Sequence, residues 1–328
     1  MKTIIDVNMT LEMWLNYWFE TYAKRIIKQS TAISYKGYIT NHIAPYIGLC
    51  ELSELNTDIL QDFFNYEMEY GNKKTGTALS AKTLHNIKLM LHKSLKKAVE
   101  LELIRMNYVE FVELPHVKKP QICTFSHSEY AKLMHELEHS DERLYFGVYL
   151  SMSTGMRLGE VLGLRWSDVD LNNNVLHIER TVNRLKTLDG ETKTALVVGT
   201  PKSEMSIRDI PFGKSLHDEF VRYRDKMQKR LGIWHFRRDD YVLMLRRGYP
   251  VEPKTMQDVF KRITAGINDD VTFHGLRHTF ATRAVERGVD IKTLSVLLGH
   301  SDVSFTLSRY THITEQQKRN AMDIISGD

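Results

Sequence analysis

Residues 274–310 read HGLRHTFATRAVERGVDIKTLSVLLGHSDVSFTLSRY, and the rest of the chain is organised around this stretch. Its apolar side chains recur at helical spacing, which predicts one helix that begins near His274 and a second over residues 291–298. Gly288 ends the first helix and Gly299 ends the second, because glycine accepts the backbone geometry of a helix C-terminus. A third helix is predicted to follow and to carry Tyr310 near its end.

Four side chains of this stretch suit phosphoryl chemistry. His274 and Arg277 lie three positions apart, so a helix places them on one face. Arginine offers a planar fork that matches two phosphate oxygens, and a histidine such as His300 can move a proton near neutral pH. Tyr310 can be a covalent nucleophile if its neighbours stabilise the phenolate. Each residue alone is more often structural, but the joint pattern favours a catalytic site.

The motifs H-G-L-R-H, L-G-H and R-Y-T-H within residues 274–312 resemble the C-terminal box of the tyrosine recombinases, most closely the integrases of phages and conjugative transposons. The resemblance implies that Tyr310 is the nucleophile and that His274, Arg277 and His300 surround the reacting phosphate. It also predicts two upstream residues, an arginine in a G-x-R-x-G-E context and a lysine in a hairpin.

The expected arginine is present in the string STGMRLGEVLGLRWSDVD, residues 153–170. Arg157 follows a glycine turn and begins a helix, and the length of the matching string favours a functional arginine over an ordinary surface one. Glu160 is placed to orient this guanidinium. Arg165 is the alternative arginine.

The expected lysine is Lys202, in TPKSEMSIRDIP, residues 200–211. The string resembles the family's lysine-bearing stretch but departs from it at Pro201, so Lys186 and Lys193 remain alternatives. The segment of residues 183–199 carries Asp-Gly at its middle, a strong hairpin signal. We expect a protruding hairpin that reaches DNA or a neighbouring subunit.

The first part of the chain predicts a helical domain. Apolar residues at helical spacing and residues suited to N-caps predict four helices and no convincing strand, over residues 10–27, 30–46, 58–70 and 80–103. Asn56 or Thr57 is expected to cap the third helix and Ser80 the fourth. In the resembling family a four-helix core-binding domain holds one face of the DNA.

The fourth predicted helix has a basic face. Residues 71–99 contain seven lysines and no acidic residue. Four of these lysines fall along one helical stripe opposite the apolar side chains: Lys82, Lys93, Lys96 and Lys97. Many such faces are merely solvated, but an acid-free one suits a phosphate backbone, where each neutralised phosphate releases a counterion.

The expected fold is mostly α with a small antiparallel β-sheet. It has a helical core-binding domain (residues 1–113), a proline-containing linker (114–123), an α+β tyrosine-recombinase catalytic domain (124–312) and a tail helix (313–328) that docks on a neighbouring protomer. In the catalytic domain we expect helices over residues 126–138, 140–153, 213–232 and 253–267, and a strand over 175–182. Whether an arm-binding domain precedes Met1 stays open.

Composition narrows the class of protein. The chain has 328 residues, 26% of them charged, and a formal net charge of +4. Cys50 and Cys123 form no disulfide or metal pattern, and no apolar run approaches the roughly 20 residues of a membrane span. These features predict a cytoplasmic protein, bacterial and nucleoid-associated by the resemblance.

The resemblance implies a cofactor-free reaction on double-stranded DNA, at element ends and attachment sites. A homodimer is expected on each duplex and a tetramer in synapsis, with an excisionase or a DNA-bending protein as a further candidate partner. Two arginines replace a metal ion in neutralising charge. Three alternatives stay open: a type IB topoisomerase, a junction-resolving nuclease and a non-catalytic DNA-binding regulator.

Overall fold

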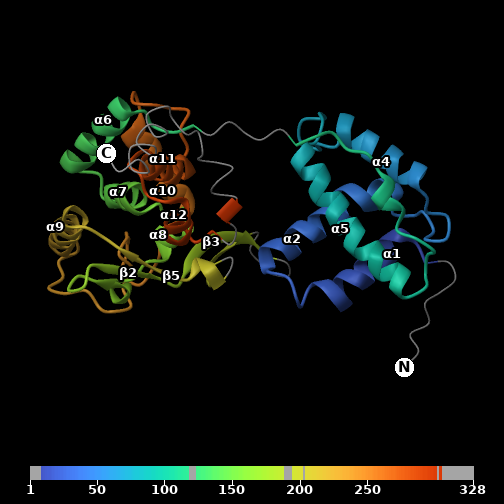
Figure 1. Cartoon of the computed structure of the whole chain (residues 1–328). Coiled ribbons are helices and arrows are strands. Elements are labelled where there is room, and N and C mark those ends of the chain that lie inside the picture. The colour runs from blue at the N-terminus through green and yellow to red at the C-terminus, as the bar shows by residue number, and fades with distance from the viewer. Residues whose placement is uncertain (1–8, 118–122, 188–193, 202–203, 301–302, 305–328) are drawn as a thin grey trace, which may run out of the picture. The chain divides into compact units, whose positions relative to one another are not determined.

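The structure is a computed structural model that describes residues 9–117, 123–187, 194–201, 204–300 and 303–304. The chain divides into two compact units, an N-terminal helical unit and a second unit that contains the small sheets. Each unit has its own apolar core. Figure 1 shows the elements of both units.

The regular elements of the N-terminal unit over residues 9–117 are helices. Its elements are α1 (Leu11–Trp18), the π-helical turn η1 (Phe19–Ala23), α2 (Gln29–Tyr38), the π-helical turn η2 (Ile39–Ile43), α3 (Ala44–Ile47), α4 (Thr57–Tyr70), α5 (Ala81–Glu100) and the 3₁₀-helix η3 (Tyr108–Phe111). α5 contacts α1, α2 and α4. The side chains on the face of α5 that meets these helices are buried, among them Leu84, Leu91 and Ala98. Lys82, Lys93 and Lys96 lie on the opposite, exposed side.

The helices of the second unit surround α7 (Tyr145–Thr154), in which every residue except Ser153 is buried. α7 contacts α6 (His127–His139), α8 (Leu158–Gly163), α9 (Lys214–Leu231), α10 (Pro253–Thr264) and α11 (Phe273–Glu286). α12 (Ile291–Leu298) packs on α11. Gly147 lets α10 approach closely, because a Cβ atom there would lie 2.8 Å from the sulfur of Met256.

Two small sheets lie beside these helices. β1 (Val169–Asp170), β2 (Val175–Ile178) and β5 (Arg208–Pro211) form an antiparallel sheet in the order β1-β2-β5, and β3 (Thr181–Lys186) pairs with β4 (Thr194–Gly199). The short 3₁₀-helices η4 (Trp166–Asp168) and η5 (Glu204–Ser206) precede β1 and β5. On β5, Arg208 and Ile210 are buried, so the guanidinium of Arg208 is directed into the unit.

The prediction of a mostly helical chain with small antiparallel sheets is confirmed. The predicted caps at Asn56 and Ser80 are also confirmed, since each side chain accepts a hydrogen bond from the first turn of its helix, and Ser126 caps α6 in the same way. No helix among the described residues is long and apolar enough to cross a membrane.

Several predicted bounds were wrong. The strand expected over residues 175–182 is two strands, because β2 pairs with β5 and β3 with β4. Between them Arg180 turns to an ion pair with Asp168 at 2.5 Å. The helix expected from residue 140 begins at Tyr145, and the one expected to reach residue 267 ends at Thr264.

Candidate active site

Two left-handed glycines bring the candidate site residues together. Gly155 ends α7 with φ of 69°, and Gly299 ends α12 with φ of 64°. Residues with a side chain rarely adopt this left-handed backbone conformation, whereas glycine adopts it without steric cost. A Cβ atom on Gly155 would also lie 2.7 Å from Leu298, so the two turns pack tightly. Their carbonyl oxygens then become acceptors for the arginines of the site.

Arg277 lies in the second turn of α11 and is only 2% exposed. One terminal nitrogen donates to the carbonyl of Gly155 at 2.8 Å, and the other donates to the carbonyl of Leu298 at 2.6 Å. That second nitrogen also lies 2.8 Å from Nε2 of His300. These contacts fix the plane of the guanidinium between the two glycine turns.

Arg157 is the N-cap of α8, as its position after the glycine turn predicts. Its guanidinium donates to Glu160 at 2.7 Å and to the carbonyl of Gly299 at 3.2 Å. Its backbone N–H also donates to Glu160, at 3.0 Å. Its side chain keeps 35% of its surface exposed, so a substrate can approach this arginine from solvent. The expected role of Glu160 as its orienting partner agrees with this geometry.

His300 is a neutral imidazole in this setting. Burial together with the charges of Arg277, Arg157 and Arg208 lowers its pKa to about 3. Because a guanidinium nitrogen can only donate, Nε2 of His300 must accept the hydrogen bond from Arg277. A neutral ring has one proton, which therefore lies on Nδ1.

Arg208 is a site residue that sequence reasoning missed. It is buried, and it donates to Glu160 at 3.0 Å, to the carbonyl of Leu297 at 2.6 Å and to the carbonyl of Ser206 at 3.0 Å. Glu160 therefore holds Arg157 and Arg208 together. Burial alone would raise the pKa of this carboxyl, but the two guanidinium groups outweigh burial and lower it.

His274 lies in the first turn of α11 with its side chain exposed. Its ring meets that of His278 edge to face, with the centroids 4.7 Å apart. His278 is 8% exposed, which suits a side chain that packs. The structure therefore brings Arg157, Arg277 and His300 together at the Gly299 turn, with His274 one helical turn away from Arg277.

Two predicted catalytic residues, Lys202 and Tyr310, lie outside the described residues, as does the predicted tail helix. Of the alternative lysines, Lys186 is exposed at the end of β3, and Lys193 is not described. Among the described residues no group of three or more His, Cys, Asp or Glu side chains could hold a metal ion.

The predicted DNA-binding lysines belong to α5 in the N-terminal unit. Lys82, Lys93 and Lys96 are exposed. Lys97 forms an ion pair with Glu100 at 3.0 Å, and its ammonium lies 5.0 Å from the ring centre of Tyr22. The acid-free face thus ends at Glu100, and Lys97 is partly neutralised.

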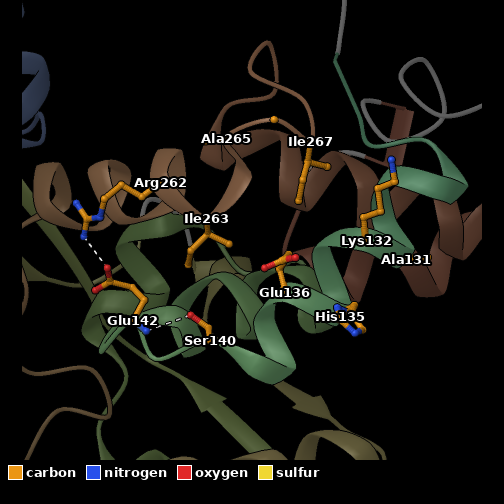
Figure 2. A pocket seen from close by; sticks show the side chains of 11 residues that line it. Ala131, Lys132, His135, Glu136, Ser140, Glu142, Arg262, Ile263, Ala265 and Ile267 are labelled. Atoms are coloured by element: carbon orange, nitrogen blue, oxygen red, sulfur yellow. Dashed lines mark hydrogen bonds and ion pairs between the residues drawn. The ribbon is translucent and has the colours of Figure 1, made fainter.

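A cavity of about 860 Å³ lies between α6 and α10, away from these residues. Figure 2 shows its lining, in which Arg262 pairs with Glu142 at 2.8 Å and apolar side chains such as Ile263 and Ile267 face inward. It contains none of the predicted site residues. The candidate site is therefore the cluster at the Gly299 turn, which solvent reaches through the side chain of Arg157 and which suits a substrate too large to enter a cavity.

Replacing Arg208 with methionine should lower the free energy of unfolding by about 3–5 kcal/mol, because one partner of a buried ion pair is removed and the carbonyls of Leu297 and Ser206 lose their donor. Urea unfolding of the purified variant measures the loss. Asp209→Ala is the matched control on the same strand, since its pair with His177 is exposed and its loss should cost under about 1 kcal/mol. Equal stabilities of the two variants would contradict the assigned contacts.

The low pKa of His300 predicts a pH dependence of stability. Between pH 6.5 and 3 the unfolded chain binds a proton at this ring that the folded chain does not. The free energy of unfolding therefore keeps its full value above about pH 6.5 and decreases as the pH falls from there toward 3. His300→Gln keeps an acceptor but does not titrate, so its urea midpoint should fall less between about pH 7 and pH 4.5. His235→Gln, at an exposed histidine, is the control. Parallel losses in wild type and His300→Gln would refute the assignment.

Comparisons with known proteins match both units. A model of the phage integrase family matches residues 124–317, and a model of the phage integrase N-terminal SAM-like domain matches residues 10–68. A protein of Caldanaerobacter subterraneus, "Tyrosine recombinase XerC-like", is 29% identical over 97% of this chain and 83% of its own length. The ICEBs1 integrase of Bacillus subtilis is 28% identical over 88% of this chain and 75% of its own length.

Solved structures share the fold. The integrase of transposon Tn1549, in complex with a circular intermediate DNA, aligns with a TM-score of 0.77 at 21% identity and covers 97% of this chain and 99% of the solved one. A lambda integrase tetramer bound to a Holliday junction aligns with a TM-score of 0.62 at 22% identity, covering 92% and 80%.

Proposed function

The chain belongs to the phage integrase family and is a tyrosine recombinase, an enzyme that cleaves and rejoins DNA. We propose that it integrates or excises a mobile element. The observation that carries the proposal is the meeting of Arg157, Arg277 and His300 at the Gly299 turn. The mobile-element assignment is supported by similar proteins that are named as integrases, the ICEBs1 integrase and the integrase of transposon Tn1549.

In the proposed reaction the hydroxyl of Tyr310 attacks a DNA phosphodiester. A 3′-phosphotyrosyl bond forms, the bond to the 5′ oxygen breaks, and that oxygen leaves as a hydroxyl after it gains a proton. The 5′-hydroxyl of a second duplex then attacks the phosphotyrosine, which rejoins the strand and releases Tyr310. Two such rounds pass through a four-way junction. The energy of the cleaved bond is kept in the covalent link, so no nucleotide cofactor is needed.

Arg157 and Arg277 supply the charge stabilisation of this mechanism. The transition state gains negative charge on its non-bridging oxygens, and donors that are already oriented stabilise that charge without reorganising. Three features support this role: the fixed plane of Arg277, the exposed side of Arg157, and the buried carboxylate of Glu160 that holds Arg157 in place. No metal ion is required for this step.

Proton transfers fall to the histidines and the lysine. Lys202 donates a proton to the leaving 5′ oxygen, and His274 accepts the proton of Tyr310 or donates a hydrogen bond. His300 is neutral, with Nε2 occupied by Arg277 and the proton on Nδ1. It therefore supports the phosphate as an N–H donor and does not act as an acid near neutral pH.

The proposed assembly follows the domain plan expected from the sequence, with a core-binding domain over residues 1–113, a linker over 114–123, a catalytic domain over 124–312 and a tail that docks in trans. Double-stranded DNA is the substrate, bound by a dimer on each duplex and a tetramer in synapsis. The lambda integrase tetramer on a Holliday junction supports this stoichiometry. We place the protein on DNA in the bacterial cytoplasm, with an excisionase or a DNA-bending protein as a helper.

Strand exchange between matched duplexes should separate this function from its alternatives. A plasmid that carries two copies of the junction of the circularised element should yield recombinant circles, whereas a plasmid without that junction should stay supercoiled. A type IB topoisomerase would relax both plasmids. A nuclease would cut without exchange, and a regulator would bind without changing either plasmid. Each of these three results would overturn the proposal.

A further inference from the structure

The exposed face of α5 has cations at both ends and uncharged side chains between them. At about 100° per residue, the positions of Asn86 and Leu89 fall on the same stripe as Lys82, Lys93 and Lys96. Leu89 is 53% exposed although the opposite face of the helix is buried. The side chain of Asn86 makes no hydrogen bond within the described part of the chain, where Lys82, Lys93 and Lys96 likewise have no ion-pair partner.

The spacing of these residues fits a helix that crosses a groove of duplex DNA. Lys82 and Lys93 lie about 16 Å apart along the axis, at a rise of about 1.5 Å per residue. The major groove is about 12 Å wide and admits a helix, with phosphates along both walls. Flexible lysine stems at the two ends can therefore reach opposite walls while the middle of the stripe faces the base edges.

We infer that α5 lies in the major groove and that Asn86 and Leu89 read the base sequence there. An asparagine amide pairs with the N6 and N7 edge of adenine, and an apolar side chain packs against the thymine methyl group. Asn86 and Leu89 are one helical turn apart, so they meet neighbouring base pairs. The lysines contact phosphates, which position the helix without reading sequence. A single exposed leucine is ordinary on a protein surface. Leu89, however, lies between Lys82 and Lys93 on a face whose positive charge suits a polyanion such as DNA.

This inference rests on the proposed function only in taking duplex DNA as the ligand. It assigns some residues to base contacts and others to phosphate contacts, and the two kinds of contact affect DNA binding differently. Loss of a base contact should relax the preference at one position and spare binding to other sequences. Loss of a phosphate contact should weaken binding to every duplex and reduce its salt dependence.

The test is selection of binding sites from a pool of randomised duplexes with the full chain. Wild type should select a block that contains adenine and thymine at neighbouring pairs. Asn86→Ala should weaken the adenine preference by about 5- to 150-fold at that position, and Leu89→Ala should relax the adjoining thymine. The double variant Lys93→Ala, Lys96→Ala should select the same block with weaker binding and a salt slope lower by about 1 to 2. Leu49→Ala, which removes another exposed leucine outside α5, should match wild type.

An unchanged profile for Asn86→Ala and Leu89→Ala would overturn the inference, as would a uniform loss of affinity for all duplexes. Thermal unfolding checks that the variants stay folded, and all four altered side chains on α5 lie on its solvent side. Covalent-adduct formation on a nicked duplex is measured in parallel. A sequence preference that depends on Asn86 without any adduct in wild type would contradict the proposed cleavage reaction alone, whereas an adduct with no such preference would contradict the α5 inference alone.

Discussion

Arg277→Lys should slow DNA strand cleavage by about 100- to 1,000-fold, the effect of removing a fixed donor from a charge-stabilising site. Lysine keeps the charge, but one ammonium on a flexible stem cannot reproduce the planar contacts with Gly155, Leu298 and His300. The variant should also unfold more easily, because a buried carbonyl without a donor costs about 1–3 kcal/mol. Single-turnover cleavage at saturating protein separates the chemical defect from weak binding.

Arg283→Lys is the matched control for this prediction. Arg283 lies on the same helix, and its guanidinium stands 3.7 Å from the ring centre of Tyr130 on α6, away from the Gly299 turn. It should cleave within about two-fold of wild type, because the cation–π contact of Arg283 with Tyr130 has only a modest value and takes no part in binding the phosphate. If folded Arg277→Lys cleaved as fast as Arg283→Lys, Arg277 would not be the phosphate-binding arginine.

Tyr310→Phe should abolish recombination, with a loss on the order of 10⁶-fold, comparable to removing the nucleophile of other covalent enzymes. The change deletes one oxygen, so DNA affinity and thermal stability should stay at their wild-type values. Plasmid recombination and gel-shift binding measure the two properties on one preparation.

Tyr249→Phe is the control for tyrosine chemistry in general. Tyr249 is 60% exposed, and its ring packs near Arg246, outside the candidate site. This variant should recombine as wild type does. Residual recombination by Tyr310→Phe, above the background of a reaction without protein, would move the nucleophile to another residue.

The sequence predicts most of the fold because the signals are local. Ser80, Ser126 and Asn56 cap their helices within a few residues of themselves, and α12 begins and ends at the expected residues. The broken strand at Arg180 could not be foreseen in this way. The strand is broken because β2 pairs with β1 and β5 while β3 pairs with β4. The pairing of β2 with β5 joins segments that are distant in sequence, so no local signal marks it.

The site was predictable as a set of motifs but not as a network of contacts. Arg208 stands in the same string as Lys202, yet nothing near it in sequence shows that it reaches the carbonyl of Leu297 on α12. The low pKa of His300 likewise arises from burial of the ring and from three neighbouring guanidinium groups, which come together only in the folded chain. The local signal that could have pointed to Arg208 is its place in Arg208-Asp-Ile-Pro211. Two positions separate it from Ile210, so on a strand the arginine faces the same side as this apolar residue.

Identification of the residue that becomes linked to DNA tests the central claim most directly. Wild-type protein is mixed with a nicked duplex from the end of the element, so that the cleaved fragment diffuses away and the covalent product accumulates. Protease digestion and mass spectrometry of the adduct then locate the linkage. The account predicts one modified peptide, with Tyr310 joined to a DNA 3′-phosphate. Linkage at another residue, or cleavage with no covalent product, would contradict it.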